Sequence, residues 1–391
     1  MITAFVDMVG LLMVLPLLPF YARDLGGDAL VVGLLVSSFS AAQLLSAPIW
    51  GRFSDRYGRR PALLIGLGAS ALAFVVFAFA NSLWLLFLSR LVQGAGGGTT
   101  GVIQAYVADA TEPENRARSL GWLSAATNLG VTIGPAFGSL TLAWGRPAPG
   151  LLAATLCAIN MLFAFNYLTE SHDIRARAAG RKAATTTSRA AVWLVLTRSS
   201  EPAPRLIWIY AIAMGAFTAI TAILALFLAD EFRVNEKTIG WFFAYMGAIS
   251  VITRAGVLGW MVDRFGEARL SRLGGLLLAT GMAAIPLTRH YSTLAIAVAF
   301  VPLGTAFTFP CVTSLLSRVI SQHERGLYMG VQQTFGGLAR VIFPIWAGFA
   351  YDRLGHGVPF WTSSVLVLGT IFLGLGMEEY TKAKRVEAAP G

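Results

Sequence analysis

The segment GRFSDRYG at residues 51–58 recurs as GWMVDRFG at residues 259–266, an offset of 208 residues. Both copies keep a glycine, the pair Asp-Arg beginning four residues later, and a second glycine at the end. Arginine followed five residues later by glycine occurs at residues 116–121 and again at 325–330, an offset of 209. The Gly/Asp-Arg/Gly pattern also occurs at residues 348–355, out of register, so one match alone is weak. Because several landmarks share one offset, we infer a duplicated unit whose copies have the same orientation.

Long apolar runs separate these repeated segments. Of the 391 residues, 56% are hydrophobic and 13% are charged, against about 25% charged residues in a soluble domain. Each run is continuous over about 20 residues, which as a helix crosses a hydrocarbon core of about 30 Å, whereas strands of a membrane barrel would alternate. We therefore predict an all-α integral membrane protein with twelve spans, near residues 2–22, 29–50, 61–80, 83–107, 117–142, 149–168, 206–229, 239–260, 270–287, 292–316, 326–349 and 358–377.

Positive charge is distributed as membrane topology requires. The net charge is +10, but the basic residues lie between spans rather than on one face, so we expect no nucleic-acid partner. With the N-terminus inside, 21 of the 30 Lys and Arg residues fall on the cytoplasmic side and six on the outer side. The positive-inside rule therefore predicts a multi-pass protein of the inner (plasma) membrane with both termini in the cytoplasm. The remaining three, Arg90, Arg254 and Arg340, lie inside spans.

The longest polar stretch divides the chain into two halves. It is rich in Ala, Thr and Arg, which is typical of a linker. Its basic residues either contact anionic membrane lipids or are simply solvated. The predicted organisation is an N-terminal six-helix bundle at 1–168, a cytoplasmic linker at 169–204, a C-terminal six-helix bundle at 205–379 and a cytoplasmic tail at 380–391.

Several segments resemble known motifs of one transporter family. GRFSDRYGRR at residues 51–60 resembles the signature between helices 2 and 3 of the major facilitator superfamily, and Arg-x-x-Gln-Gly at 90–94 resembles its helix 4 motif. The motif of antiporters in this superfamily is similar to residues 130–138, Gly-x-x-x-Gly-Pro-x-x-Gly. The first helix of its twelve-helix drug:proton antiporters, which include tetracycline exporters, is similar to residues 7–10, Asp-x-x-Gly. The resemblance implies two pseudo-symmetric six-helix bundles and proton-coupled efflux (antiport) of a small amphiphilic compound or drug by alternating access.

The repeated segments are candidate gates at the cytoplasmic face. We expect Asp55 to lie against the positive N-terminal end of span 11 and Asp263 against that of span 5, closing the inner side while the cavity faces out. Asp109 can pair with the arginines that follow Asp55. The position 209 residues after Asp109 holds Arg318, so we do not expect a fully symmetric charge network. The predicted gating residues are Gly51, Asp55, Arg56, Gly58, Arg59, Arg60, Asp109, Arg116, Gly259, Asp263, Arg264 and Gly266.

Asp7 and Arg90 are the candidate proton-coupling residues. An unpaired carboxylate inside a span is costly, so Asp7 is expected either to take up a proton or to find a cation, unless it is close enough to the interface to be hydrated. Arg90, Gln93 and Gly94 share one helix face at spacings of three and four residues, and that face should look into the cavity. There Arg90 would coordinate substrate or displace the proton from Asp7.

Polar and aromatic residues on the expected cavity helices suit an amphiphilic organic substrate. Arg254 lies near enough to the end of its span to reach the interface, so Arg340 is the better candidate in the second half. The predicted substrate-binding residues are Arg90, Gln93, Asn128, Phe217, Thr221, Tyr245, Phe307, Gln332, Gln333 and Arg340. The predicted helix-packing and helix-bending residues are Gly94, Gly130, Gly134, Pro135, Gly138 and Pro344.

Other classes of protein fit the sequence less well. The two cysteines lie inside apolar runs and the four histidines lie apart in connections, so neither a metal site nor an enzyme centre is expected. No Gly-Lys-Ser/Thr follows a glycine-rich turn, which argues against ATP-driven transport, and we expect no cofactor. The main alternative is a carrier of lipid-like or metabolite substrates that works as a uniporter or symporter; a membrane-embedded enzyme or a channel fits less well. A monomer would suffice for the mechanism.

Overall fold

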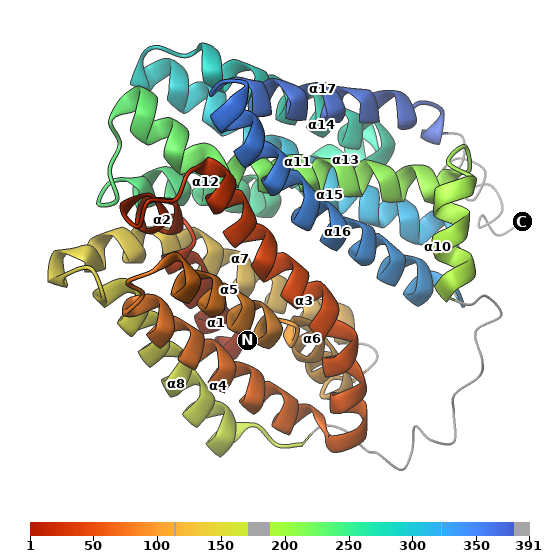
Figure 1. Ribbon diagram of the computed structural model, residues 1–391. Coiled ribbons are helices and arrows are strands. Elements are labelled where there is room, and N and C mark those ends of the chain that lie inside the picture. Colours follow the sequence, from red (N-terminus) through yellow and green to blue (C-terminus); the bar gives the residue numbers. More distant parts are fainter. Residues whose placement is uncertain (113–114, 171–187, 322, 379–391) are drawn as a thin grey trace, which may run out of the picture. The chain divides into compact units, whose positions relative to one another are not determined.

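The structure is a computed structural model that describes residues 1–112, 115–170, 188–321 and 323–378, and it is helical wherever it is regular (Figure 1). Two compact units are present: unit 1 comprises Met1–Arg181 and Ala222–Ala248, and unit 2 comprises Lys182–Thr221 and Ile249–Gly391. The α-helices are α1 (Ile2–Val14), α2 (Leu18–Asp24), α3 (Ala29–Tyr57), α4 (Arg59–Ala78), α5 (Leu83–Gly97), α6 (Thr100–Asp109), α7 (Arg116–Thr141), α8 (Ala148–Tyr167), α10 (Ser188–Thr197), α11 (Pro202–Phe232), α12 (Ile239–Ile252), α13 (Leu258–Phe265), α14 (Glu267–Ala284), α15 (Tyr291–Val319), α16 (Arg325–Arg353) and α17 (Val358–Leu373). A π-helical turn, Thr253–Val257, joins α12 to α13.

The predicted spans coincide with helices. Eight helical segments in the described ranges are long and apolar enough to cross a membrane: Ile2–Asp24, Ala29–Tyr57, Arg59–Ala78, Ala148–Tyr167, Pro202–Phe232, Ile239–Phe265, Glu267–Leu287 and Tyr291–Val319. Val358–Leu373 is a shorter apolar helix. The other predicted spans are occupied by α7, by α16 and by the pair α5 and α6. That pair is interrupted next to the glycine run at residues 96–98, because glycine is a poor helix former.

Unit 1 is built on close helix contacts at glycine. α1 packs on α7 and α8, and α4 packs on α5 and α8. A Cβ built on Gly130 or Gly134 of α7 would come within 2.7 or 2.8 Å of a backbone oxygen of α1, and one on Gly138 would overlap the backbone oxygen of Met13. The small residues therefore let the two helix backbones approach closely, as the stripe on span 5 predicts.

Residues 222–248 pack within unit 1, although the sequence pattern assigns them to the second half. The hydroxyl of Ser139 in α7 accepts a hydrogen bond from the Gly240 backbone N–H at 2.9 Å and donates one to the Glu236 carbonyl at 2.8 Å. Most of the proposed linker, residues 171–187, and of the C-terminal tail, residues 379–391, lies outside the described residues. The predicted domain boundaries stay a prediction.

Unit 2 has its own hydrophobic core. α14 packs against α15 and α17, and a buried apolar cluster joins α10, α11, α15 and α16. Tyr210 of α11, Val312 of α15 and Phe335 of α16 belong to this cluster. The core thus holds together the helices that carry Tyr210, Gln333 and Arg340.

Candidate functional site

Arg90 is a buried cation in the middle of unit 1. Its side chain belongs to α5, is 1% exposed, donates a hydrogen bond to the Gln93 side-chain oxygen, and lies over the Phe39 ring at 4.5 Å from the ring centre. Within the described residues its Nε has no hydrogen-bond partner and no carboxylate pairs with it. The predicted face of α5 therefore exists: Gln93 is buried beside Arg90, and Gly94 lets α5 pack directly on the Phe39 backbone oxygen. Desolvation of a charge this deep is costly unless a ligand or water offsets it.

Asp7 is half-buried in α1 and faces α8. It interacts electrostatically with Cys157 of α8, and one turn away Asn160 of α8 donates to the Thr3 carbonyl at 2.9 Å. Among the described residues, no hydrogen bond or ion pair involves the Asp7 side chain, which leaves its carboxylate available to a proton. Sequence reasoning did not single out Asn160, because an isolated asparagine in a span has no distinctive spacing.

The first repeated segment forms a charged network, here named the first-half cluster (Asp55, Arg59 and Asp109). Arg59 is buried at the start of α4; its guanidinium pairs with Asp55 at 2.8 Å and with Asp109 at 3.3 Å, and donates to Ser54 at 2.6 Å. The backbone N–H groups of Arg59 and Arg60 donate to Glu170 at 2.8 and 3.1 Å. Asp109 thus meets the arginine cluster as expected, and Glu170 is an additional member that the sequence did not indicate.

The other predicted gating residues of unit 1 surround this cluster. Gly58 has a φ of +105°, which ends α3 in a conformation that suits glycine. The Arg56 guanidinium lies near the Tyr57 ring, and Arg116 donates from Nε to the Ala108 carbonyl at 2.9 Å. Apart from the backbone of its own helix, no atom of the described residues of unit 1 lies within 4 Å of a Cβ built on Gly51.

The second repeated segment carries the corresponding pair with opposite charges, here named the second-half cluster (Glu267 and Arg318). Glu267 is buried at the start of α14, accepts a hydrogen bond from Ser314 at 3.3 Å and forms an ion pair with Arg318. Asp263, which corresponds to Asp55, is exposed and has no ion pair among the described residues. Arg264 lies near the Trp260 ring, and Gly266 has a φ of +77°. The expected contacts of Asp55 and Asp263 with spans 11 and 5 stay predictions.

Polar donors of unit 2 gather around Tyr210. The Gln333 amide donates to the Tyr210 hydroxyl oxygen at 3.4 Å, and both Arg254 and Arg340 interact electrostatically with Tyr210. Phe309 packs edge-on against the Tyr210 ring with centres 5.5 Å apart, and Phe217 packs on Phe309 at 6.4 Å. Sequence reasoning found Arg340, Gln333 and Phe217 but missed Tyr210, which joins them.

The remaining predicted substrate-binding residues differ in how much accessible surface they keep. Asn128 donates to the Ser124 carbonyl of its own helix at 2.7 Å, and Thr221 to the Phe217 carbonyl at 2.9 Å. Phe307 is 5% exposed in a core cluster with Leu270 and Cys311, and Gln332 is fully buried. Tyr245 is 41% exposed in unit 1. Phe307 and Gln332 are therefore enclosed by protein, whereas the others keep accessible surface.

Ion pairs at the α2 end of unit 1 were also not indicated by the sequence. Both terminal nitrogens of Arg23 donate to the Asp230 carboxylate, at 2.7 and 2.9 Å. Arg146 pairs with Asp24 at 2.5 Å, and the Tyr21 hydroxyl donates to the Arg146 carbonyl. Arg23 and Asp230 are 207 residues apart in sequence, so only the fold brings them together.

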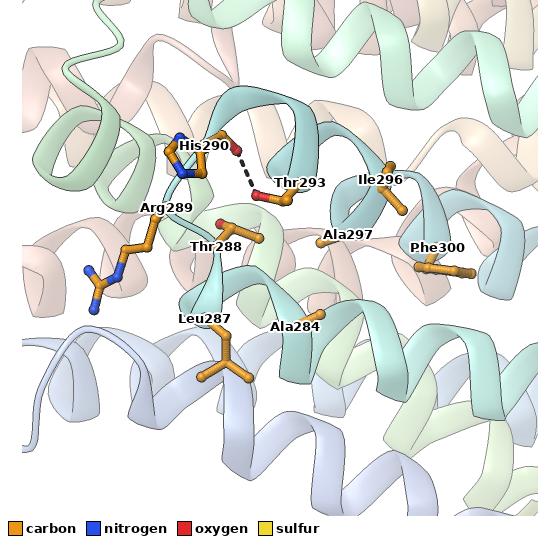
Figure 2. Close-up of a pocket in the computed structure, with 9 residues that line it drawn as sticks. All are labelled: Ala284, Leu287, Thr288, Arg289, His290, Thr293, Ile296, Ala297 and Phe300. Carbon is orange, nitrogen blue, oxygen red and sulfur yellow. Dashed lines mark hydrogen bonds between the residues drawn. The ribbon is translucent and has the colours of Figure 1, made fainter.

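A shallow surface pocket lies in unit 2 beside α15 (Figure 2). It has a volume of about 470 Å³ and is mainly apolar, with Arg289 and His290 at the connection before α15. The Arg289 side chain points away from the other residues of the pocket (Figure 2). None of the predicted substrate-binding residues lines this pocket.

Comparisons with known proteins support the motif assignments. A model of the Major Facilitator Superfamily matches residues 1–344 and, a second time, residues 206–391. The chain is 30% identical over 347 residues to the class C tetracycline resistance protein of Escherichia coli, covering 88% of this chain and 86% of that one. It is 24% identical over 387 residues to multidrug resistance protein 2 of Bacillus subtilis (strain 168), covering 98% of this chain and 94% of that one.

A solved structure agrees over the same length. The crystal structure of the human organic anion transporter MFSD10 (TETRAN) matches with a TM-score of 0.70 and 25% identity, covering 95% of this chain and 97% of that one. The fold prediction of twelve helices in two related bundles is thereby confirmed. This chain is a multi-pass membrane transporter of small molecules rather than an enzyme, and it belongs to the Major Facilitator Superfamily.

Proposed function

We propose that this transporter exports an amphiphilic organic compound in exchange for protons, by alternating access. The observation that carries the proposal is that Asp7 lies in a spanning segment of unit 1 and Arg90 is buried in α5, while neither has an ion-pair partner among the described residues. Opposite charges left unpaired at such depth are unusual, and intramembrane ionisable residues commonly serve proton or substrate pathways. Relatives named for tetracycline and multidrug resistance support the same conclusion.

Asp7 is the proposed proton carrier. Its carboxylate can be neutralised by a proton at low cost, because no cation of the described residues holds it in the ionised form. In the cycle, Asp7 takes up a proton while the transporter is open to the outside, as the compound leaves. Asp7 releases that proton while the transporter is open to the cytoplasm, before the next molecule of the compound is bound and carried outward. The neighbouring Asn160 oxygen is buried without a hydrogen-bond partner, so a protonated carboxyl or a water has an acceptor nearby.

Arg90 is the proposed partner of substrate in unit 1. Its bond to Gln93 and its position over Phe39 orient the guanidinium. Arg90 is therefore able to bind an acceptor group of the compound without a large reorganisation.

The proposal also covers placement in the membrane. Both termini lie in the cytoplasm, the protein resides in the inner membrane surrounded by lipid, and a monomer is the working unit. Relatives named for tetracycline, for multiple drugs and for organic anions do not share one substrate class, so they leave the charge of this substrate open.

Proton release from proteoliposomes tests the coupling. The purified protein is reconstituted and challenged with tetracyclines, cationic drugs, organic anions and lysolipids while the internal pH is recorded. We expect one class to drive proton movement in the wild type and not in Asp7→Asn. The matched control is Glu112→Gln, an exposed acid of unit 1 outside the spans, which should behave as wild type. Substrate flux without proton movement, unchanged in Asp7→Asn, would favour a uniporter instead.

Cysteine labelling tests the orientation. Both native cysteines, Cys157 and Cys311, are buried, so an introduced surface cysteine gives a clean signal. We expect a membrane-impermeant maleimide to label Ser292→Cys in intact cells, because Ser292 is exposed at the start of α15, next to a connection that lies outside in the proposed topology. Ser199→Cys, before α11, should react only after the membrane is opened. The reverse pattern would contradict the proposed orientation.

A further inference from the structure

Two arginines of unit 2 lie at membrane depth without a counter-charge. Arg340 follows the first residue of α16 by 15 positions, or about 22 Å of helix, and Arg254 precedes the last residue of α13 by 11, or about 16 Å. Both are half-buried, and the Nε of each is buried without a hydrogen-bond partner in the described residues. Each arginine therefore combines an unmet donor with some accessible surface on its residue.

No carboxylate of the described residues of unit 2 neutralises these two charges. The acids there lie at the ends of helices, and the buried one, Glu267, is paired with Arg318, while Glu378 is paired with Arg272. A purely structural role for a buried arginine requires an acid or a set of carbonyl acceptors, because an unpaired buried charge is strongly destabilising. The acceptor is therefore expected to come from outside the protein.

Tyr210 joins the two arginines into one donor cluster. Arg340 lies one turn after Gly336, whose position in α16 contacts the Tyr210 ring, and the charge of Arg254 on another helix is also near Tyr210. Because its oxygen already accepts a hydrogen bond from Gln333, its own O–H proton is free to point elsewhere. Gly336 makes this placement possible, since a Cβ there would approach the Tyr210 ring to 2.7 Å. The cluster presents two guanidinium groups and one hydroxyl donor, which together form a site for an anion.

The surroundings suit an anion that carries an apolar body. Phe309 and Phe217 form a chain of edge-on aromatic contacts leading from Tyr210, and Phe343 packs beside α11 at Gly215. Arg254 itself lies in the π-helical turn Thr253–Val257, a local departure from the α-helix that frequently accompanies functional sites. Guanidinium groups bind carboxylate, sulfonate and phosphate oxygens with two parallel hydrogen bonds, while the rings hold aromatic or aliphatic groups.

We propose that Arg254, Arg340 and Tyr210 form an anion-binding site and that the transported compound is an amphiphilic organic anion. The inference rests on the proposed export function and specifies the charge class of its substrate. Arg340 and Arg254 bind the anionic group, Tyr210 donates a hydrogen bond to it, and the phenylalanines contact the apolar part. A soluble organic anion and an anionic lysolipid share this chemistry.

Two dyes of opposite charge on one scaffold test the proposal. Sulforhodamine B is a net anion because the phenyl ring on its xanthene core carries two sulfonates, and rhodamine 6G is a cation with a similar xanthene core. Binding of each to the purified full-length protein is measured by fluorescence polarisation. We expect the wild type to bind sulforhodamine B more tightly than rhodamine 6G. Arg340→Gln or Arg254→Gln should weaken the binding of sulforhodamine B about tenfold to a hundredfold, which is the effect of losing a charge-assisted hydrogen bond. Arg340→Lys should recover part of the affinity, because the charge remains but the planar fork does not.

Two controls separate this site from others. Arg289→Gln removes a positive charge from the pocket of Figure 2 and should leave dye binding unchanged. Gly336→Ala displaces the Tyr210 ring without removing charge, and should lower the affinity severalfold. If lysophosphatidylglycerol displaces the bound dye and lysophosphatidylcholine does not, the anion site is supported and its ligand is an anionic lipid. If only benzenesulfonate displaces the dye, the anion site is supported and its ligand is a soluble organic anion.

The outcomes distinguish this inference from the export proposal. Preferential binding of rhodamine 6G, unaffected by Arg254→Gln and Arg340→Gln, would overturn the anion site and leave proton-coupled export standing. Binding of sulforhodamine B that is lost in Arg289→Gln instead would place the site elsewhere and also overturn the assignment. Dye binding with the expected variant pattern, but no proton movement with any substrate class, would retain the site and refute antiport.

Discussion

The first-half and second-half clusters occupy corresponding positions in the duplicated chain but carry opposite charges. Arg59 and Glu267 are 208 residues apart and each is the first residue of its helix, while Asp109 and Arg318 are 209 apart. In both clusters the residue at the helix start is buried, with side chains 6% and 9% exposed, and is paired with its partner. The comparison teaches that duplication preserved the place of an ion pair while its polarity was free to change.

The surroundings of the two clusters explain why both polarities are tolerated. An acid at a helix N-terminus complements the helix dipole, and Glu267 supplies that acid itself in α14. Arg59 has the unfavourable sign at the start of α4, and there Glu170 accepts both free backbone N–H groups instead. Asp55 adds a second negative charge to Arg59, whereas Asp263 has no basic residue at the corresponding position. Each half therefore compensates its buried charge with a different set of residues.

Reversal of the buried charge in the first-half cluster should have the largest effect. In Arg59→Glu, three acids surround a buried carboxylate, namely Asp55, Asp109 and Glu170. We expect the free energy of unfolding to fall by about 3–5 kcal/mol, as when a buried pair loses one partner. Thermal unfolding of the detergent-solubilised protein measures it, with the exposed Arg56→Glu as control. If the two variants unfold at the same temperature, the first-half cluster contributes no more than surface charge.

An exchange of the pair in the second half should be tolerated much better than either single change. Glu267→Arg alone is expected to lower the free energy of unfolding by about 2–3 kcal/mol. Addition of Arg318→Glu should bring the free energy of unfolding to within about 1 kcal/mol of the wild-type value, because the introduced arginine can also pair with Asp263, four residues before it. The matched exchange Arg59→Glu with Asp109→Arg should recover less, since Asp55 and Glu170 still repel the introduced glutamate. Equal recovery in both halves would contradict the proposed asymmetry.

Removal of the helix-capping charge should have the smallest effect. Glu170→Gln keeps an oxygen acceptor at the start of α4 but removes the negative charge beside the helix dipole. The expected loss is about 0.3–1 kcal/mol, and it should shrink as salt is raised. Unfolding midpoints at low and high salt measure it. A larger, salt-independent loss would mean that Glu170 acts through packing instead.

Much of this architecture could be predicted from the sequence. The apolar runs fixed the helices, and the glycine spacing at residues 130–138 predicted the close contact of α7 with its neighbour. Asp109 could be placed near Arg59 and Arg60 because the acid and the two arginines lie at the same end of their spans. The exchange of charges is only partly indicated by the sequence analysis: Arg318 occupies the position that corresponds to Asp109. An ion pair is predicted only when Glu267 is also aligned with Arg59, and the structure supplies that second correspondence.

Other features could not be predicted because they depend on tertiary packing. Tyr210 has no motif around it, and its role follows from Gln333, Arg254 and Arg340 on other helices. The Arg23–Asp230 pair joins the ends of two helices, α2 and α11, that are far apart in sequence, and the charges alone indicate only topology. Phe307 looked like a cavity residue by type, yet helix rotation places it in the core of unit 2.

Uphill transport driven by a proton gradient tests the central claim most directly. Proteoliposomes with a pH difference across the membrane receive the compound identified by proton release, and its accumulation is followed for wild type, Asp7→Asn and Glu112→Gln. The account predicts accumulation against the concentration gradient toward the more acidic compartment in wild type and Glu112→Gln, and mere equilibration in Asp7→Asn. Equal distribution of the compound in all three proteins, whatever the pH difference, would contradict proton-coupled export.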